Sequence, residues 1–551
     1  MRTEGVMLHF ADIFEAIADA VPDAPAITQG DHVMRWGEFD DHAARLAAAF
    51  AAHGFGEGSK IGMFMYNGPE YLVTQYAAFK ERITPVNVNY RYLDDELAYL
   101  LDNADCEAIV FHRSLGDRLL RILDRLPQLA WCVSVDDGDA PGGVEVTGAD
   151  AFDDVLAGHE PAPRRERSAD DLYLLYTGGT TGMPKGVMYA VGPFTEGFLG
   201  FVAVGMGRAP FESSDEVAEV VAAAVAAGRQ PVAMPACPLM HGTGVWLGAL
   251  LPHLSGGEVA LLEGRSFEAH ELWRVVERRG VNTIVMVGDA FGRPMLQALR
   301  ERESTPYDVS AVNAYISTGA MLSTEVKEGL LEFTPSAMIM DVLGSTEGGM
   351  AQKVAVKGAV GETASFGAMP TTKVFGPDDR EVVAGSGEIG IVAVSGPNIP
   401  LGYYKDDEKS ARTFRTIDGV RYSFPGDMAM VEADGSMTLL GRGSNCINTA
   451  GEKVFPEEVE EVVKTHPAVA DCLVFGVDDE RFGQRVVGVF SVDPGADMPG
   501  GDADLAQRVI AYAKTKLASY KVPKQLLAVD VVPRAPNGKA DYKTARSLLT
   551  T

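Results

Sequence analysis

The chain has 551 residues, of which 46% are hydrophobic and 23% charged, as in ordinary folded globular proteins. This length exceeds what one compact core usually holds, so two or more domains are expected. The formal net charge of −29 argues against nucleic-acid binding, because a phosphate backbone repels such a surface. Any site for a polyanion must therefore be locally basic or built from backbone N–H groups.

The cysteine pattern and the lengths of the apolar runs indicate the cellular compartment in which the protein is expected. The cysteines are odd in number, far apart and without a C-x-x-C pair, which favours a reducing cytoplasm over a disulfide framework or a zinc site. The N-terminal residues lack the pattern of a signal peptide, and no apolar run is long enough to span a bilayer. The apolar stretch 198–207 predicts buried core instead. The five cysteines are Cys106, Cys132, Cys237, Cys446 and Cys472.

Helical and β-rich patterns alternate over the first several hundred residues. Residues 39–53 predict a helix that ends at Gly54, residues 60–65 a strand, and residues 69–80 a second helix. This alternation is typical of parallel sheets covered by helices, so we expect an α/β fold for a large N-terminal domain. Further β-rich runs occupy residues 107–111, 281–287 and 338–343.

The pattern changes at the glycine-rich segment 441–445. A helix is predicted after it at residues 456–464, with acidic residues in its first turn, which suits the helix dipole. We therefore expect residues 1–441 to form the large domain, residues 442–444 a hinge, and residues 445–551 a small α+β domain. The other elements predicted for the small domain are strands at 470–477 and 485–492 and a helix at 504–517.

A loop suited to a polyphosphate follows the β-rich run 172–176. Residues 177–186 contain four glycines, three threonines and one lysine. Glycines let backbone N–H groups approach phosphate oxygens, hydroxyls donate hydrogen bonds, and the lysine adds positive charge. The spacing is not that of a Walker loop, and a plain surface turn is the alternative. The predicted phosphate-binding residues are Thr177, Gly178, Gly179, Thr180, Thr181, Gly182 and Lys185.

This loop resembles the signature of the ANL superfamily of adenylate-forming enzymes, with Gly178 where serine is common. The remaining family motifs follow in the expected order over nearly the whole chain. The resemblance implies the ANL fold, with a mobile C-terminal domain, and an AMP-forming acyl-CoA synthetase that uses ATP, Mg²⁺ and coenzyme A. Carboxylate coordination of Mg²⁺ and ATP oxygens is sound chemistry for such a reaction.

The resemblance also implies roles for residues around the nucleotide. Gly319 and Ala320 resemble the turn against adenine, Thr346 resembles the residue that contacts phosphate, and Glu347 the residue that holds Mg²⁺. The motif of Thr346 has Leu343 where an aromatic residue is usual. Three further residues of this motif are assigned to the nucleotide site: Asp341, Gly344 and Ser345.

Motifs near the hinge imply contacts with the rest of ATP. Asp427 resembles the aspartate that binds both ribose hydroxyls, and Arg442 the arginine that contacts ribose or phosphate. Ser444 occupies the hinge position, where Asp or Lys is usual. Lys539 resembles the lysine of the adenylation step, which bridges the developing charge between carboxylate and phosphate.

Two further sites are implied for the other substrates. Ala450, Gly451 and Glu452 resemble the family segment that forms the tunnel for the pantetheine arm of CoA. In this segment Asn448 stands where the family often has a lysine. The acyl pocket is expected to include His241, Gly242, Asp289 and Gly344. The stretches 245–250 and 287–291 are largely apolar, so an apolar acid, fatty or polycyclic, is favoured.

At the level of the subfamily, segments 86–92, 177–180 and 398–404 resemble actinobacterial synthetases that activate steroid side-chain carboxylates. Two alternatives to an acyl-CoA synthetase stay open. An acyl-AMP ligase would deliver the acyl group to a carrier protein, and a non-catalytic relative would only bind ligand. The presence of all five nucleotide-site residues argues against the second alternative: Thr346, Glu347, Asp427, Arg442 and Lys539. A homodimer is possible by analogy with ANL enzymes.

Overall fold

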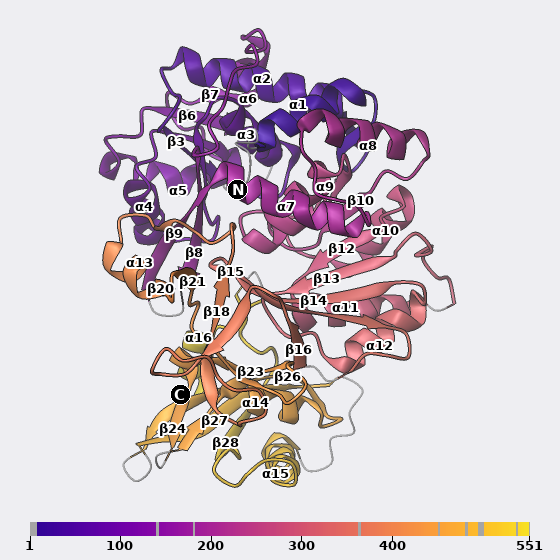
Figure 1. The fold of residues 1–551 in the computed structure, drawn as a ribbon, viewed down its shortest axis with the longest axis vertical. Helices are drawn as coiled ribbons and strands as arrows, with labels where there is room; N and C mark the ends of the chain where they lie inside the picture. Colours follow the sequence, from indigo (N-terminus) through magenta and orange to yellow (C-terminus); the bar gives the residue numbers. More distant parts are fainter. Residues whose placement is uncertain are drawn as a thin grey trace. The chain divides into compact units, whose positions relative to one another are not determined.

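The computed structural model describes residues 8–138, 143–179, 182–302, 304–361, 365–449, 452–479, 483–493, 501–535 and 538–549. The chain divides into two compact units (Figure 1). Unit 1 comprises Met1–Gly349, Val354–Val360 and Ser395–Ser423, and unit 2 comprises Met350–Lys353, Gly361–Val394 and Phe424–Thr551. By this division the predicted hinge 442–444 lies inside unit 2, and its role stays a prediction.

Unit 1 contains a sheet whose strands run in the order β2-β1-β11-β10-β12-β13-β14. All neighbours in this series are parallel except β1 and β2. The strands are β1 (Pro25–Gln29), β2 (His32–Arg35), β10 (Val232–Pro235), β11 (Glu258–Leu261), β12 (Thr283–Met286), β13 (Ala314–Thr318) and β14 (Met338–Ser345). β15 (Gly348–Val356) is divided between the two units.

A second, eight-stranded sheet of unit 1 has the order β19-β9-β8-β4-β3-β5-β6-β7. Its pairs from β4 to β7 are parallel, whereas β8, β9 and β19 form an antiparallel end. Its strands are β3 (Lys60–Phe64), β4 (Thr84–Asn87), β5 (Ala108–His112), β6 (Trp131–Val135), β7 (Asp150–Ala151), β8 (Leu172–Gly179), β9 (Gly182–Ala190) and β19 (Gly402–Tyr403). The expected parallel-rich α/β architecture is confirmed.

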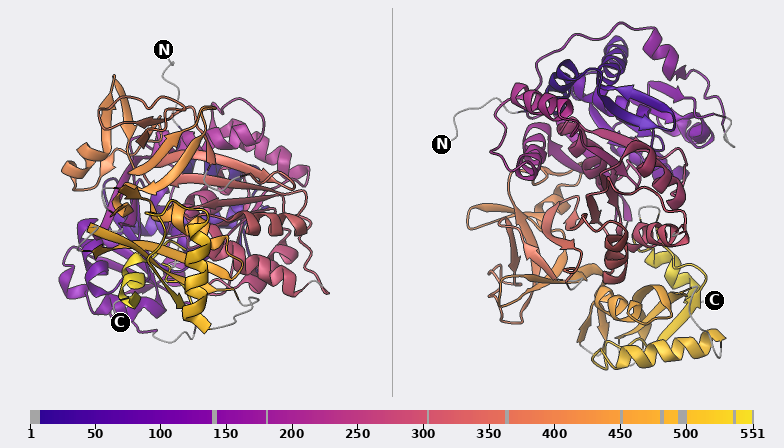
Figure 2. Two further views of the ribbon diagram at one scale, coloured as in Figure 1. Left: turned by 90° about the horizontal axis from the view of Figure 1, so that it is seen from below. Right: turned by 90° about the vertical axis from the view of Figure 1, so that its right-hand side faces the viewer.

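Helices cover these sheets (Figures 1 and 2), and the predicted helix 69–80 matches α3 at both ends. A hairpin of β20 (Phe414–Ile417) and β21 (Val420–Ser423) follows α13. The helices of unit 1 are α1 (Phe10–Ala20), α2 (Trp36–Ala52), α3 (Pro69–Lys80), α4 (Asp94–Asn103), α5 (Gly116–Leu120), α6 (Phe152–Ala157), α7 (Val191–Gly205), α8 (Ser214–Ala226), α9 (Leu251–Leu254), α10 (Ala269–Arg279), α11 (Gly288–Glu301), α12 (Thr324–Phe333) and α13 (Asp407–Thr413).

The apolar stretch 198–207 is not wholly buried, contrary to the prediction. It forms the end of α7, where Phe198 is buried but Phe201 and Val204 are 53% and 78% exposed. An amphipathic helix buries one stripe only, so an apolar residue on its other face stays in solvent. Apolar composition alone did not distinguish the two faces.

Unit 2 has an antiparallel sheet with the order β16-β23-β22-β18, in which β17 also pairs with β18. A five-stranded sheet near the C-terminus has the order β25-β24-β27-β26, with β28 beside β27. The strands are β16 (Ser365–Ala368), β17 (Thr372–Phe375), β18 (Ile389–Ser395), β22 (Asp427–Val431), β23 (Met437–Arg442), β24 (Ile447–Thr449), β25 (Glu452–Val454), β26 (Val469–Asp479), β27 (Gly483–Val492) and β28 (Gln525–Val529).

The C-terminal sheet is covered on both faces. Alternate residues of β26 separate into two cores, since successive side chains of a strand point to opposite faces. Cys472 and Val474 pack with α14 (Pro456–Lys464) and α15 (Gly501–Lys514), whereas Leu473 and Phe475 pack with α16 (Tyr542–Leu549). The predicted helix 456–464 matches α14 at both ends.

Candidate active site

Four neighbouring parallel strands of unit 1 end at one edge of their sheet. Met286 of β12 pairs with Ser317 of β13, and Ser317 pairs with Asp341 of β14. Carboxyl ends of parallel strands meet at the same edge, where α/β proteins bind their ligands. The register therefore brings together predicted residues that follow β10, β12, β13 and β14, namely His241, Gly242, Asp289, Gly319, Ala320, Thr346 and Glu347.

Two tyrosines fix the segment that follows β14. The Tyr189 hydroxyl donates to the carbonyl of Thr346, and the Tyr403 hydroxyl donates to Glu347 Oε1 at 2.7 Å. Both tyrosines come from the antiparallel end of the eight-stranded sheet, where Tyr403 pairs with Val187. Burial, with the Glu347 carboxylate nearby, raises the pKa of Tyr189 well above its ordinary value. Tyr189 therefore stays protonated and remains a donor.

Glu347 fits a cation that is shared with a nucleotide. Mg²⁺ is commonly held by one or two carboxylates together with substrate phosphates and water. Among the described residues, no group of three or more His, Cys, Asp or Glu side chains could hold a metal by itself. Tyr403 engages one carboxylate oxygen, Oε1, of Glu347. A lone, oriented carboxylate suits Mg²⁺·ATP better than an all-protein metal cage.

Asp341 is paired with a buried lysine. Lys327 of α12 is fully buried, and its Nζ forms an ion pair with Asp341 Oδ2. A buried ion pair is costly to desolvate, but an unpaired buried charge costs more. Lys327 thus holds one oxygen of Asp341 in place; the nucleotide contact expected from Asp341 stays a prediction.

The predicted phosphate loop is the tip of the β8–β9 hairpin. Thr177 pairs with Lys185, and Gly179 with Gly182, so the loop expected over 177–186 is wrong in extent because most of it continues the two strands. Thr180 and Thr181 lie outside the described residues. Gly178 is exposed at the hairpin and belongs to β8.

Asn87, at the end of β4, links this hairpin to the segment that precedes His241, a predicted residue of the acyl pocket. Its Nδ2 donates to the carbonyls of Tyr176 at 2.9 Å and Met240 at 2.6 Å, and its Oδ1 accepts from the Tyr176 N–H at 2.6 Å. Asn87 is buried, so losing these bonds would leave unsatisfied amide groups in the interior. The strand before Lys185 and the residue before His241 are therefore fixed by one side chain.

A π-helix, Thr243–Leu250, begins directly after Gly242. Such helices occur frequently at functional sites. Gly244 lets it lie against the turn that precedes His241, since a Cβ there would clash with the Pro238 carbonyl. The Asn67 side chain accepts from the Leu239 N–H at 2.8 Å and donates to the Cys237 carbonyl at 3.2 Å.

Asp289, expected in the acyl pocket, has protein partners. Its Oδ1 accepts from the Ser323 N–H at 2.8 Å, and its Oδ2 lies 3.6 Å from Arg293. The preceding Gly288 has a φ of +53° and lies against the backbone of Ala320 and Met321, where a Cβ would clash. Asp289 thereby orders the turn that carries Ala320, and its contact with substrate stays a prediction.

Unit 2 carries the predicted ribose-binding pair. Asp427 and Arg442 are paired across β22 and β23, with Nε of Arg442 3.7 Å from Asp427 Oδ1. Gly441 has a φ of +109°, and a Cβ there would clash with the carboxyl of Glu457. Burial and the neighbouring Glu460 raise the pKa of Glu457, while the backbone N–H of Arg442 donates to its carboxyl.

The remaining predictions fall at the C-terminal end. Lys539 is exposed and follows the buried Gly538. Ser444 lies in a short 3-10 helix, Gly443–Asn445, and Glu452 is an exposed residue of β25. Ala450 and Gly451 lie outside the described residues.

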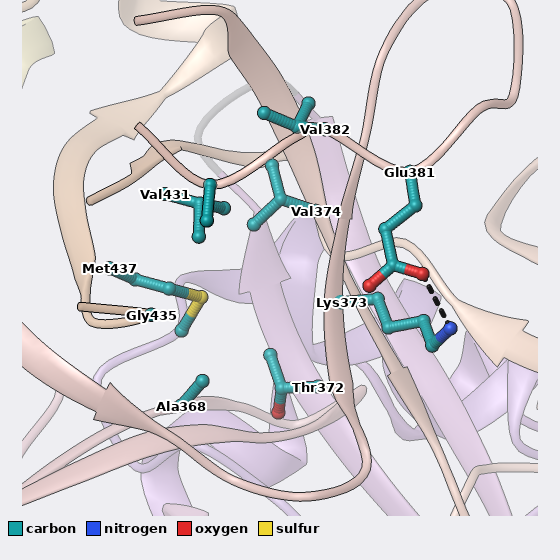
Figure 3. Close-up of a pocket in the computed structure, with 10 residues that line it drawn as sticks. Ala368, Thr372, Lys373, Val374, Glu381, Val382, Val431, Gly435 and Met437 are labelled. Atoms are coloured by element: carbon teal, nitrogen blue, oxygen red, sulfur yellow. Dashed lines mark hydrogen bonds and ion pairs between the residues drawn. The ribbon is translucent and has the colours of Figure 1, made fainter. Parts of the chain in front are cut away.

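A separate cavity in unit 2 contains none of the predicted residues (Figure 3). It has a volume of about 280 Å³ and is lined by apolar side chains such as Val374 and Met437. Lys373 and Glu381 form an exposed ion pair of 2.6 Å at its side. The charged residues that line it, Lys373 and Glu381, are exposed and paired with each other, so we assign no binding function to this cavity.

Sequence reasoning missed several residues that the structure places at the site. Tyr189, Tyr403 and Lys327 contact the predicted site residues Thr346, Glu347 and Asp341. Asn87 contacts Tyr176 and Met240, which directly precede the predicted residues Thr177 and His241. None of these four residues was given a role. Tyr403 and Asn87 lie in segments that carry the steroid-synthetase resemblance. No local pattern reveals which partner such a side chain reaches.

Comparison with known proteins identifies the class. Residues 14–404 match the AMP-binding enzyme family, and residues 458–539 match the AMP-binding enzyme C-terminal domain. The chain therefore belongs to the AMP-binding enzyme family, and the expectation of an ANL-type, AMP-forming acid–thiol ligase is confirmed.

Two relatives and one solved structure are closely similar over nearly the whole chain. The chain is 39% identical to a medium/long-chain-fatty-acid–CoA/3-oxocholest-4-en-26-oate–CoA ligase of Mycobacterium marinum, covering 98% of this chain and 96% of the relative. It is 39% identical to a 3-oxocholest-4-en-26-oate–CoA ligase of Rhodococcus rhodochrous, covering 98% and 95%. The crystal structure of an anthranilate CoA ligase in complex with anthranoyl-AMP has a TM-score of 0.82 at 21% identity, covering 99% and 98%, and supports the fold alone.

These matches bear on the cofactors and on the acceptor. AMP-forming CoA ligases use ATP, Mg²⁺ and coenzyme A, so the cofactors expected from the sequence are confirmed. Delivery to a carrier protein is not favoured. No helix in the described part of the chain is long and apolar enough to cross a membrane.

Proposed function

We propose that this enzyme joins an apolar carboxylic acid, a fatty acid or a steroid side-chain acid, to coenzyme A through an acyl-adenylate. The main support is the convergence of β10, β12, β13 and β14 on one edge, where Tyr403 orients Glu347 and Tyr189 orients Thr346. The named substrates of the two bacterial ligases support the class of acid.

The first step follows from the predicted roles. A carboxylate oxygen of the acid attacks the α-phosphorus of ATP, a new P–O bond forms, and the bond to pyrophosphate breaks. Lys539 offers an ammonium to the charge that develops between carboxylate and phosphate. Lys185 and the hairpin N–H groups hold the polyphosphate, Asp427 holds the ribose, and Glu347 holds Mg²⁺. When bound, Mg²⁺ neutralises charge on the phosphate oxygens.

The second step forms the thioester. The thiol sulfur attacks the acyl carbon, and the bond from that carbon to AMP breaks. We assign Ala450, Gly451 and Glu452 to the passage of the thiol arm. Residues 442–444 are proposed as the hinge by which one site serves both steps, with Ser444 in place of a charged hinge residue.

A substrate panel tests this function. The purified enzyme is given ATP, Mg²⁺, CoA and carboxylates of graded chain length and ring content, and thioesters are measured by mass spectrometry. Long-chain or steroid acids are expected to react better than short or charged ones. Accumulation of acyl-AMP without thioester in the presence of CoA would contradict a CoA ligase and favour a carrier protein.

Location and assembly are further parts of the proposal. The five cysteines are all free, which supports a cytoplasmic enzyme. A homodimer is proposed by analogy with ANL enzymes, and light scattering coupled to size exclusion decides between a monomer and a dimer.

A further inference from the structure

The loop that carries Lys539 is closed by backbone hydrogen bonds. Arg534 and Ala540 form an antiparallel bridge, and the Ala535 N–H donates to the Lys539 carbonyl at 2.7 Å. The Gly538 N–H donates to the Ala535 carbonyl at 2.8 Å. These bonds fix the two legs of the turn relative to each other, but they do not attach the turn to the C-terminal sheet.

Val532 and Ala540, on either side of the turn, pack against the core of this sheet. The guanidinium of Arg534 adds a polar attachment directly at the turn. Its Nε and Nη2 donate to the two carboxylate oxygens of Asp471, on β26, at 2.6 Å each. Its Nη1 donates to the Gly538 carbonyl, in the peptide bond that precedes Lys539, at 3.1 Å. All three nitrogens are therefore used, two on the sheet and one on the loop.

The charges around this pair keep it ionised. Burial acts to raise the pKa of Asp471, but hydrogen bonds and charge from Arg534 hold it below its ordinary value. Lys464 lies 3.8 Å from Asp471 and acts in the same direction. Glu460 and Tyr542 complete the cluster, with the Tyr542 hydroxyl donating to Glu460 at 3.3 Å. A bidentate pair of this kind is strong and geometrically specific.

We propose that Arg534 and Asp471 are positioning residues for the adenylation step, because they hold the peptide from which Lys539 extends. This inference rests on the proposed function of Lys539. Lysine has a single nitrogen and cannot replace the planar fork, so even Arg534→Lys is expected to release the loop. Small displacements of a catalytic group cost about a hundredfold in rate.

The two half-reactions separate positioning from general damage, because Lys539 acts only in the first. Adenylation is measured as acid-dependent exchange of labelled pyrophosphate into ATP, with dodecanoate or the best acid of the panel. Thioester formation is measured from the synthetic acyl-adenylate of that acid and CoA. Arg534→Gln, Arg534→Lys and Asp471→Asn are expected to lower the exchange rate about ten- to a hundredfold and to leave thioester formation unchanged.

Matched variants make each outcome decisive. Lys521 forms a comparable ion pair with Glu458, at 2.6 and 2.8 Å, without touching the Lys539 loop, so Lys521→Gln should retain both half-reactions. The double variant Arg534→Gln/Asp471→Asn should lose no more than the worse single variant, as for residues acting through one contact. Equal losses in both half-reactions, or full exchange in the Arg534 variants beside an inactive Lys539→Ala, would overturn the inference. Full exchange in Lys539→Ala itself would instead overturn the proposed role of Lys539, and the inference with it.

Discussion

At the scale of single residues, the carboxylate of Glu347 illustrates how a site is prepared before ligand binds. The Tyr403 hydroxyl occupies Oε1 and restricts the carboxylate to one orientation. Residues that orient a metal ligand commonly raise metal affinity by about ten- to a hundredfold. In the proposed function, Tyr403 therefore orients the metal ligand Glu347 without touching the metal itself.

Tyr403→Phe should raise the Mg²⁺ concentration needed for half-maximal pyrophosphate release by about tenfold, because the carboxylate loses its orienting donor. A Mg²⁺ titration at saturating ATP measures this shift. The neighbouring Tyr404 also donates to a carboxylate, Asp105, at 2.8 Å, so Tyr404→Phe is the matched control. Equal Mg²⁺ dependence in the two variants would show that Tyr403 has no special connection with the metal.

Lys327→Met should destabilise the enzyme by about 3–5 kcal/mol, because it removes the buried cation that forms an ion pair with Asp341. The free energy of unfolding in urea measures the loss. Lys405 pairs with Asp105 at 2.7 Å but is 44% exposed, so Lys405→Met should cost at most about 1 kcal/mol. Similar losses in both variants would argue against the burial of the Lys327 pair as the cause.

At the scale of elements, sequence patterns predicted α3 and α14 at both ends, since proline at the first position marks the start of each helix. In α14 the apolar residues also recur at the helical period. The hairpin of β8 and β9 was mistaken for a loop from Thr177 onward. Glycine and threonine density suggested irregular backbone, whereas the antiparallel pairing that keeps Thr177 opposite Lys185 is a contact between two segments. Local composition does not reveal such pairing.

The π-helix after Gly242 makes a specific prediction. Gly244→Ala should cost about 1–3 kcal/mol in stability, because the new Cβ clashes with the Pro238 carbonyl and displaces the turn that carries His241. The KM for the acid should rise as well. Gly200, in α7, has nothing within 4 Å of a Cβ, so Gly200→Ala should be neutral or stabilising. An unchanged KM in a folded Gly244→Ala variant would separate this helix from acid binding.

At the scale of the whole molecule, ionisable groups buried in unit 1 couple folding to pH. Burial lowers the pKa of His9 to about 3 and that of His112 and of His253 to about 4. The unfolded chain binds protons at these histidines near pH 6.5, whereas the folded chain does not. Burial raises the pKa of Glu70 and acts in the opposite direction at the acid end of the range.

The stability of unit 1 should therefore fall as the pH decreases from about 6.5 toward 5. Each of the three histidines contributes up to about 1.4 kcal/mol per pH unit, because the unfolded state takes up one more proton. Urea unfolding followed by tryptophan fluorescence at several pH values measures the slope. A free energy of unfolding that stays constant or increases as the pH is lowered from about 6.5 to 5 would contradict the buried, neutral histidines.

The sequence predicted the class of enzyme and most of the residues at the sheet edge, because those residues lie in contiguous motifs. It could not predict the residues that hold them. Tyr403 lies 56 positions from Glu347, and Arg534 lies 63 positions from Asp471. Such pairs are created by topology, so no local pattern identifies them, whereas parallel register explains why separate motifs converge.

The central claim, adenylation of a carboxylate, has a direct test in oxygen transfer. The best acid of the panel is prepared with oxygen-18 in its carboxylate and converted with ATP and CoA, and the AMP is examined by mass spectrometry. Attack of a carboxylate oxygen on the α-phosphorus, followed by thiol attack on the acyl carbon, leaves one labelled oxygen in each AMP formed. Unlabelled AMP, or ADP as the nucleotide product, would contradict the acyl-adenylate.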